Sequence, residues 1–313
     1  IKKVIEIYPN SVAATGNIGD LYYQTGEYEK SKCFYEKVLN VKPDNASAYV
    51  GIGNALSALS DREGSVKSYK KATEIKPDHA GALWNLYGTS SDIEEAKMWV
   101  SKCLEADQHH TKALLTSLVL EVYEDSRLNI DTLVDRKYQN HPIIRSLKWT
   151  LGLSIKPKLL FNTWAFLDFV IEHSEKKRPF YEFGVWRGKS FKYLISAFKK
   201  GYGFDTFTGL PEKWYQHNVG GYSGNDIIPE IEGGKFIKGT FEETLPTFFN
   251  QKRPLASVIN FDADLYSSTI CALNNCKAII DEKTILVFDE FLINSQWEED
   301  EYKALVEFCE NNK

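Results

Sequence analysis

The sequence predicts an α + α/β chain of two parts: an all-α solenoid of repeats, then a Rossmann-like, doubly wound α/β domain. Three observations indicate this. Pro9, Pro43 and Pro77 lie 34 residues apart (43 − 9 and 77 − 43). Residues 180–199 read as a buried strand, a glycine-rich turn and a helix. After them, apolar strands alternate with helical patterns, which predicts a parallel sheet with right-handed crossovers.

Length and composition support two soluble domains. A chain of 313 residues exceeds one typical core, and its 43% hydrophobic and 26% charged residues are typical of globular proteins. The net charge of −5 argues against a nucleic-acid partner. No apolar run reaches the roughly 18 residues of a membrane span. Five cysteines without a C-x-x-C pair indicate reduced thiols, and we expect a cytoplasmic protein.

A period of 34 with a helix-turn-helix pattern is typical of tetratricopeptide repeats. Small and aromatic residues recur at the positions where paired helices would pack closely. The third unit is about three residues short near 88–91, and Gln108 stands where a proline is expected. Residues 111–123 read as a capping helix. Ile1 falls late in a repeat, so we expect further repeats upstream.

These patterns divide the chain into a repeat domain at 1–125 (starting mid-repeat), a helical connector at 126–156 and an α/β domain at 157–313. Amphipathic helices are expected at 143–153 and at 159–173, the second packing on the sheet and helping to close its site. Strands are expected at 180–185, 201–207, 235–238, 256–261 and 284–288. Helices are expected at 191–199, 243–250, 267–281 and 298–310.

The first strand and turn carry the first functional signal. Ligands of doubly wound domains bind at the carboxyl end of the first strand, where glycines allow close approach and a helix offers free N–H groups. Glu182 lies at that strand end, and an acid suits an ammonium better than a pyrophosphate. The spacing E-x-G-x-x-x-G also disfavours a nicotinamide oxidoreductase, which would carry G-x-G-x-x-G.

Later motifs follow in a fixed order, and together they resemble the macrocin O-methyltransferase family of class I S-adenosylmethionine-dependent methyltransferases. The resemblance covers residues 157–313. The segments that carry it are E-F-G-V-W-R-G-K-S at 182–190, F-D-T-F-T-G-L-P at 204–211, E-T-L-P at 243–246, D-A-D-L-Y-S-S-T at 262–269 and the acidic pair Asp289-Glu290. The family usually continues with one or two more strands after 307–308, so we expect the domain to extend beyond Lys313.

The resemblance implies a bound S-adenosylmethionine. It places Asp205 at the ribose hydroxyls, as acids are placed in nucleotide-binding α/β folds. The methionine part would lie among Glu182, Gly184, Gly188 and Ser190, and the adenine near Gly239, Thr240 and Phe241. The alternative to a donor site is a plain strand, turn and helix with a solvated acid. For Thr240 and Phe241, the donor-binding and the purely structural interpretations are equally open.

Two adjacent strands end in the carboxylates Asp262, Asp264, Asp289 and Glu290, which would repel one another unless compensated. Mg²⁺ prefers such oxygen ligands and would lower the pKa of a bound acceptor hydroxyl. The resemblance implies a magnesium site on Asp262, Asp289 and Glu290, although the family more often has aspartate at 290. Solvated acids at strand ends are the alternative. Leu265 stands where a catechol methyltransferase would place a lysine, which disfavours that mechanism.

His217 and Asp262 are the catalytic candidates. His217 lies in the polar stretch 214–225, where it could accept the hydroxyl proton or be a surface histidine. The glycine-rich segment 220–234 reads as a lid over the acceptor or as a plain excursion. The first hypothesis is therefore an O-methyltransferase acting on a hydroxyl of a sugar or glycosylated natural product. The second is a non-catalytic scaffold with a degenerate methyltransferase domain.

The resemblance to tetratricopeptide arrays also implies a protein partner in a concave groove lined by the first helix of each repeat. An extended peptide could bond there, with Tyr23 as an anchor; the alternative is a spacer or a homodimer surface. The implied positions are Ala13, Gly16, Asp20, Tyr23 and Gln24 in one repeat, and Ser47, Val50, Asn54, Ser57 and Ala58 in the next.

Overall fold

The computed structural model describes residues 11–312, and the predictions made for Ile1 and Pro9 lie outside them. The chain forms two compact units. One contains the residues up to Arg136 together with Leu151–Thr163, and the other contains Lys137–Thr150 and the chain from Trp164 onward. The segment expected as a separate connector, 126–156, is therefore divided between the two units. A helical array followed by a parallel α/β sheet confirms the predicted fold class.

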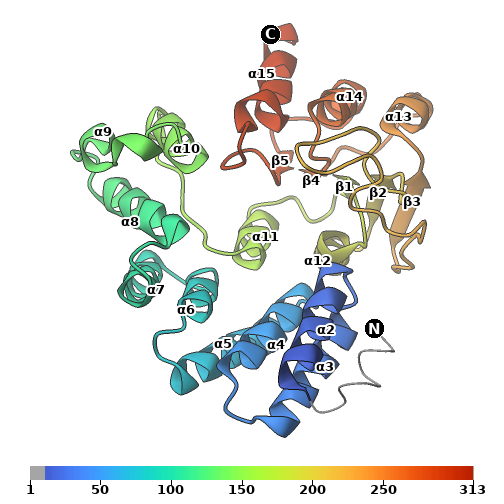
Figure 1. Ribbon diagram of the computed structural model, residues 1–313. Coiled ribbons are helices and arrows are strands. Elements are labelled where there is room, and N and C mark those ends of the chain that lie inside the picture. Colours follow the sequence, from blue (N-terminus) through green and yellow to red (C-terminus); the bar gives the residue numbers. More distant parts are fainter. Residues whose placement is uncertain (1–10, 313) are drawn as a thin grey trace. The chain divides into compact units, whose positions relative to one another are not determined.

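The first unit is an array of antiparallel helices, coloured blue to green in Figure 1. Its helices are α2 (Val12–Gln24), α3 (Tyr28–Val41), α4 (Ala46–Ala58), α5 (Arg62–Ile75), α6 (Ala80–Tyr87), α7 (Ile93–Ala106), α8 (Thr111–Glu124) and α9 (Ile130–Leu133). The 3₁₀ turn η1 (Arg136–Tyr138) follows at the point where the chain passes to the second unit.

The start of each repeat is fixed by an N-cap side chain. Ser11, Asn45, His79 and His110 each accept a hydrogen bond from the backbone N–H three residues on, which satisfies a donor that the helix leaves free. The caps lie 34, 34 and 31 residues apart (45 − 11, 79 − 45, 110 − 79). The 31-residue step confirms that the third unit is three residues short, and its first helix, α6, has only 8 residues.

Close packing between the paired helices depends on glycine facing tyrosine. A Cβ on Gly51 would lie 2.3 Å from the Tyr35 ring, and one on Gly53 would lie 2.4 Å from the Tyr69 ring. Tyr69 then donates its hydroxyl to Asn54 Oδ1 at 2.9 Å. The small and aromatic residues of the repeat pattern therefore pack helix against helix, as predicted.

The helix expected at 159–173 begins later than predicted, as α11 (Thr163–Glu172). Leu159 and Phe161 lie before it and pack with the repeat helices, where the Phe161 ring meets Tyr87 edge-on at 5.9 Å. Tyr123 also donates its hydroxyl to the carbonyl of Pro157 at 2.6 Å. These contacts explain why 151–163 belongs to the first unit while α11 belongs to the second.

The second unit is built on a five-stranded, all-parallel sheet of order β3-β2-β1-β4-β5 (Figure 1). The strands are β1 (Phe180–Phe183), β2 (Gly201–Asp205), β3 (Gly234–Lys238), β4 (Val258–Phe261) and β5 (Ile285–Phe288). The helices between and around them are α10 (Pro142–Leu151), α11, α12 (Lys189–Phe198), α13 (Phe241–Phe249), α14 (Tyr266–Cys276) and α15 (Glu301–Asn311), with the 3₁₀ turns η2 (Lys277–Ile279) and η3 (Trp297–Glu299).

Alternation along the strands separates the two faces of this sheet. Tyr181 and Phe183 of β1 lie in an apolar cluster with α13, α14 and α15. Phe180 lies in a second cluster with α11 and α12 on the opposite face. The packing of α11 on the sheet is therefore confirmed. Both faces of the sheet are buried, as is usual for parallel strands.

The connection from β2 to β3 differs from the others. Residues 206–233, all within the described chain, form no helix or strand apart from an isolated bridge between Trp214 and His217. Several of its residues have positive φ, among them Phe207 at 59° and Tyr222 at 55°. A long loop thus stands where a doubly wound fold usually has a crossover helix.

The end of the chain packs on α10. The Trp149 ring meets Phe291, Trp297 and Tyr302 at centroid distances of 5.7, 6.1 and 5.6 Å. Arg145 donates from Nε and Nη2 to the two oxygens of Glu298 at 2.6 and 3.0 Å. Residues 137–150 are therefore part of the α/β unit.

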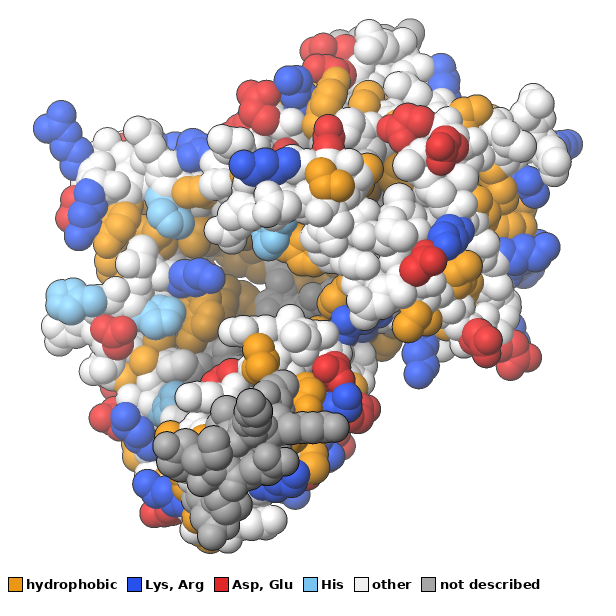
Figure 2. Space-filling model, turned by 45° about the vertical axis from the view of Figure 1, so that its right-hand side comes forward, with side chains coloured by type: hydrophobic (Ala, Val, Ile, Leu, Met, Phe, Trp, Pro, Cys, Tyr) orange, Lys and Arg blue, Asp and Glu red, His pale blue; other side chains and the backbone are white. Residues whose placement is uncertain are grey.

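In the described part of the chain, no helix is both long enough and apolar enough to cross a membrane. On the face drawn in Figure 2, acidic and basic side chains are interspersed rather than gathered by sign. This distribution agrees with the modest net charge of −5.

Candidate functional site

The carboxyl ends of the strands meet at one edge of the sheet, and the chain continues the ladder there by backbone hydrogen bonds. Gly184 N–H donates to the Phe204 carbonyl at 2.9 Å, and Asp262 N–H donates to the Phe183 carbonyl at 2.8 Å. The strand order reverses between β1 and β4, so this edge is the switch point at which ligands of such sheets bind.

The glycine-rich loop after β1 lies directly at this switch point. Gly184 has φ +87°, and a Cβ there would lie 1.8 Å from the carbonyl oxygen of Asp262, so only glycine fits. Gly188, at φ +74°, is the N-cap of α12 and lies against Ile231 and Pro229. The loop therefore brings a helix N-terminus to the end of β1, as predicted, and its two glycines let Asp262, Pro229 and Ile231 approach the backbone closely.

Glu182 is fully buried in β1, at the level of Asn260 in β4. Ser190 Oγ donates to its Oε1 at 3.1 Å, and Asn260 Nδ2 donates to its Oε2 at 3.2 Å. Burial raises the pKa of Glu182 to about 8, while the two hydrogen bonds oppose that rise. Glu182 and Ser190 are thus adjacent, and Asn260 completes the group.

Asp205, at the end of β2, holds the glycine-rich loop. Its Oδ2 accepts hydrogen bonds from the backbone N–H groups of Val185 and Trp186, both at 2.7 Å. Its Oδ1 accepts one from Phe207 N–H at 2.6 Å. Three of the roughly four acceptor sites of a carboxylate are therefore occupied by protein. This leaves one site for the ribose hydroxyl contact that the sequence predicts.

The residues predicted near the adenine lie at the start of α13. Gly239 has φ +139° and donates its N–H to the carbonyl of Asp205 at 3.0 Å. Thr240 is the N-cap of α13 and makes no side-chain capping bond. Phe241 is only 8% exposed and meets Phe183 edge-on at 5.6 Å. Phe241 is therefore part of the core on that face of the sheet.

Six carboxylates gather beyond β4 and β5, and we call them the acidic cluster: Asp262, Asp264, Asp289, Glu290, Asp300 and Glu301. Burial and the charges of Glu290, Asp289 and Asp300 raise the pKa of Asp264 to about 7. Burial and neighbouring carboxylates also hold the pKa of Asp262 and Glu301 well above its usual range. Like charges are therefore concentrated here.

The predicted magnesium ligands lie in this cluster, but they do not form a metal site. Among residues 11–312, no group of three or more His, Cys, Asp or Glu side chains is arranged to hold a metal ion. Asp262, Asp289 and Glu290 share a neighbourhood without converging on one point. The donor set as placed does not fit magnesium, so no chemical step is assigned to a metal.

His217 belongs to an aromatic group in the long loop. Its Nε2 lies 3.2 Å from the Tyr222 hydroxyl, and its ring is stacked on Trp214 at 5.9 Å. Burial raises the pKa of Tyr222, with smaller contributions from the charges of Asp264 and Glu290. His217 thus contacts a tyrosine that faces the acidic cluster, and it lies on the loop predicted as a lid.

Side-chain contacts hold the long loop, residues 206–233, on two sides of the site. Leu210 and Trp214 pack on Leu265, and Ser267 Oγ donates to Glu212 at 2.5 Å. On the other side, Trp186 Nε1 in the glycine-rich loop donates to the Ser223 carbonyl at 3.3 Å. The loop therefore spans from the glycine-rich loop to the start of α14.

Several members of the site are not marked by any motif in the sequence. Asn260 could have been noticed, because it is a polar residue inside an apolar strand. Tyr222 lies in the glycine-rich segment 220–234, where the sequence does not distinguish it from its neighbours. Asp300 and Glu301 were hidden in the acidic run 298–301, where nothing distinguishes the buried members from the exposed ones.

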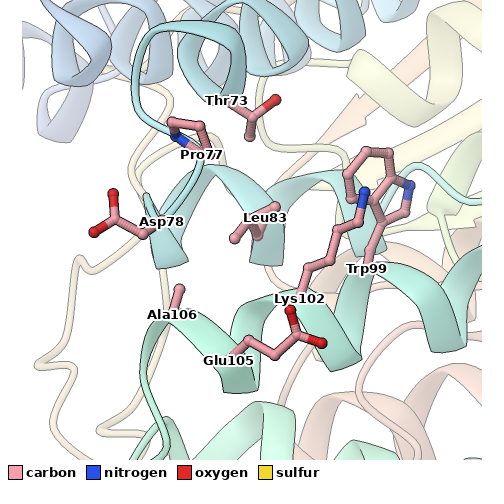
Figure 3. Close-up of a pocket in the computed structure, with 8 residues that line it drawn as sticks. All are labelled: Thr73, Pro77, Asp78, Leu83, Trp99, Lys102, Glu105 and Ala106. Atoms are coloured by element: carbon pink, nitrogen blue, oxygen red, sulfur yellow. The ribbon is translucent and has the colours of Figure 1, made fainter.

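A separate pocket of roughly 400 Å³ lies within the repeat unit, between α5, α6 and α7 (Figure 3). Leu83, Trp99 and Ala106 form its apolar part, and Lys102 lies over the Trp99 ring at 5.0 Å. None of the predicted cofactor, metal or catalytic residues lines it.

The sequence matches no curated protein. Among solved structures, CalS11, a calicheamicin methyltransferase, is 17% identical with a TM-score of 0.39, covering 63% of this chain and 84% of its own. The first TPR of Spaghetti (RPAP3) bound to the HSP90 peptide SRMEEVD is 17% identical with a TM-score of 0.33, covering 35% and 90%. MamA is 18% identical with a TM-score of 0.35, covering 47% and 84%. TM-scores this low support no conclusion about fold or function.

Family models match the N-terminal helices. Residues 19–60 match a model described as TPR repeat, and residues 46–79 match one described as tetratricopeptide repeat. The matches span α2 to α5 and agree with the 34-residue spacing of the helix caps. The N-terminal unit therefore contains tetratricopeptide repeats.

Proposed function

We propose that this chain is an S-adenosylmethionine-dependent O-methyltransferase whose repeats recruit a protein partner. The observation that carries the proposal is the position of the loop from Gly184 to Gly188 at the end of β1, where the strand order reverses. The order β3-β2-β1-β4-β5, the motifs along it and the acidic edge beside it all support the same interpretation. The acceptor would be a hydroxyl of a sugar or a glycosylated small molecule.

The residues present are compatible with the donor at its amino-acid end. Gly184 and Gly188 place no side chain at the two positive-φ positions of the loop, and the positive end of the α12 helix dipole would favour a carboxylate. Glu182 is not exposed, so it would act by holding Ser190 and the loop rather than by touching the donor. When bound, the donor would supply an electrophilic methyl group, and the protein would hold the acceptor hydroxyl in line with it.

The proton of the acceptor hydroxyl needs a base. His217 and Asp262 remain the two candidates. His217 is half-buried in the long loop, and its Nε2 lies against the Tyr222 hydroxyl. Asp262 follows β4, and burial raises the pKa of its carboxyl group, which makes the ionised carboxylate a stronger base. His217→Ala and Asp262→Asn, each assayed for rate and for donor affinity, would identify the base by a loss of rate at unchanged affinity.

Donor binding is the first test. Titration calorimetry with S-adenosylhomocysteine should show one saturable site, which Gly188→Ala should weaken because φ +74° is strained for alanine. Gly16→Ala is the matched control, since its Cβ would meet nothing within 4 Å. Methyl transfer from labelled donor to a panel of sugars follows. No binding by the unmodified chain would favour the scaffold hypothesis.

A partner would bind the face formed by α2 and α4, which lie side by side. Asp20 and Asn54 of that face already accept hydrogen bonds from Tyr35 and Tyr69, so they brace the repeats as well. Tyr23, by contrast, is 38% exposed, and its hydroxyl makes no hydrogen bond to any residue in 11–312. It is therefore the better anchor.

The partner is tested by a pull-down with Tyr23→Ala. Leu21→Ala is the control, because Leu21 is 42% exposed and lies two residues away, on the opposite side of α2. Loss of a partner with Tyr23→Ala alone, at an unchanged methylation rate on a free sugar, would support recruitment. Equal capture by both variants would place the contact elsewhere or leave the array as a spacer.

Cytoplasmic location remains part of the proposal, in line with five unpaired cysteines.

A further inference from the structure

Two helices of the repeat unit begin with a histidine ring that serves as the capping acceptor. Nδ1 of His79 accepts the N–H of Ala82 at 3.2 Å at the start of α6. Nδ1 of His110 accepts the N–H of Ala113 at 3.1 Å at the start of α8. At the same position of α4, Oδ1 of Asn45 accepts the N–H three residues on at 3.0 Å. The three caps are alike in geometry, but only the histidines titrate near neutral pH.

An imidazole ring accepts a hydrogen bond at Nδ1 only while that nitrogen is unprotonated. In the neutral ring the proton is then on Nε2, and Nε2 of His79 lies 3.4 Å from the Ser47 hydroxyl, to which it can donate. A protonated ring donates from both nitrogens, so it can no longer accept the N–H of Ala82. It also places a positive charge at the positive end of the α6 dipole. Protonation therefore turns a stabilising cap into a group that opposes the helix.

The charges that act on His79 come from its own turn. Burial lowers the pKa of His79 below the usual 6.5, Lys76 lowers it further, and Asp78 opposes this shift. A histidine whose pKa is lowered by folding stabilises the folded state above pH 6.5, and this contribution is lost as the pH falls through the folded pKa. Acid should therefore weaken the start of α6.

The His110 ring has an aromatic neighbour. It packs against the Trp84 ring of α6 at a centroid distance of 5.1 Å. Because Trp84 restrains the ring, protonation would place an Nδ1–H donor against the N–H of Ala113. Asp107, the acid of the preceding turn, uses its Oδ1 to accept the N–H of His109 at 3.0 Å. The cap of α8 is therefore lost on protonation in the same way as the cap of α6.

The two histidine caps hold one packed segment, α6 to α8, which we call the histidine-capped segment. Leu83 of α6, Val100 of α7 and Leu120 of α8 share an apolar cluster, and all three are buried. Between them, α7 is capped by Asp92, and a backbone hydrogen bond from Glu95 lowers the pKa of this aspartate below 3.8, so its cap persists in mild acid. Loss of either histidine cap therefore loosens helices that pack on the same cluster.

We propose that the histidine-capped segment is an acid-sensitive part of the repeat array. Protonation of His79 and His110 would release the first turns of α6 and α8, while α4, capped by Asn45, would stay in place. The array would thus be graded along its length, and mild acid would loosen its later repeats before its earlier ones. The inference is independent of the proposed methyl transfer, because its test requires neither donor nor acceptor.

Amide hydrogen exchange on the full chain measures each cap at an equivalent alanine. Between about pH 7.5 and about pH 5, the protection factors of the Ala82 and Ala113 N–H groups should fall by about tenfold, a loss typical of an N-cap. The protection factor already removes the intrinsic pH dependence of exchange. The N–H of Ala48, which is bonded to Asn45, should keep its protection to within about twofold.

Exchanging the caps tests the cause. His79→Asn combined with His110→Asn keeps an acceptor at both caps and removes the titration, so the protection of α6 and α8 should no longer fall in acid. Asn45→His should transfer the acid sensitivity to α4. His109→Asn is the matched control, because this exposed neighbour of His110 is not an N-cap, and it should leave the acid response unchanged.

Three results would overturn the inference. One is a chain in which Ala82 and Ala113 keep their protection in acid as Ala48 does. Another is an acid response that persists in the paired asparagine variant. The third needs no variant: imidazole ¹⁵N spectra at about pH 7.5 that show a protonated Nδ1 in His79 and His110 would mean that the rings do not accept the N–H groups.

Discussion

Removing the Asp205 carboxylate should loosen the glycine-rich loop before any ligand is present. In the structure this carboxylate accepts three backbone hydrogen bonds, from Val185, Trp186 and Phe207, at 2.7, 2.7 and 2.6 Å. These three groups belong to the two loops that follow β1 and β2. Asp205→Ala leaves all three N–H groups without their acceptor.

The magnitude follows from the contacts. A hydrogen bond to a charged group contributes about 1.5–3 kcal/mol, but water replaces part of the loss at this half-exposed side chain, so Asp205→Ala should cost about 2–4 kcal/mol in local stability. Asp205→Asn can keep the oxygen that serves Val185 and Trp186, while its amide would face the N–H of Phe207. It should cost about 1–2 kcal/mol.

Amide hydrogen exchange measures these bonds directly. In Asp205→Ala, the N–H groups of Val185, Trp186 and Phe207 should exchange roughly 30- to 1,000-fold faster, with a smaller change in Asp205→Asn. Asp226→Asn is the control: Asp226 is an exposed acid of the same long loop that pairs with the exposed Lys238, and asparagine tolerates its φ of +61°. Unchanged exchange in Asp205→Ala, with weaker binding of S-adenosylhomocysteine alone, would refute the bracing role and make Asp205 a direct ligand.

Three further predictions concern stability. Gly184→Ala should lower the free energy of unfolding by more than about 3 kcal/mol, since its Cβ would lie 1.8 Å from a carbonyl oxygen. Gly16→Ala should raise the free energy of unfolding by up to about 1 kcal/mol. Thermal unfolding of both variants measures the difference. Burial raises the pKa of Glu182 from 4.5 to about 8, so the folded state keeps a proton that the unfolded state has lost. The free energy of unfolding should therefore fall by up to about 1.4 kcal/mol per pH unit as the pH rises from 4.5 to about 8. Urea titrations of Glu182→Gln at several pH values should lack this slope. Tyr69→Phe removes one hydrogen bond to Asn54 and should cost about 0.5–1.5 kcal/mol in urea unfolding; no change would mean that the repeats do not depend on this brace.

The sequence by itself determined the elements and their order. Helix caps repeat at fixed spacing, and apolar periodicity separates strands from helices, because both depend on residues close together in the chain. The glycines at 184 and 188 were recognisable for the same reason: the turn after β1 requires positive φ at each. Acids at the ends of β4 and β5 were predicted to meet, since parallel strands end at one edge.

Only the tertiary structure decided how those residues are used. The three bonds accepted by Asp205, the burial of Phe241 and the attachment of residues 159–161 to the repeats depend on partners far away in the chain. The same holds for the entry of Glu301 into the acidic cluster, since nothing in the run 298–301 marks which carboxylate is buried. A hydrogen bond or a buried charge is a property of two surfaces brought together, and local sequence specifies only one of them.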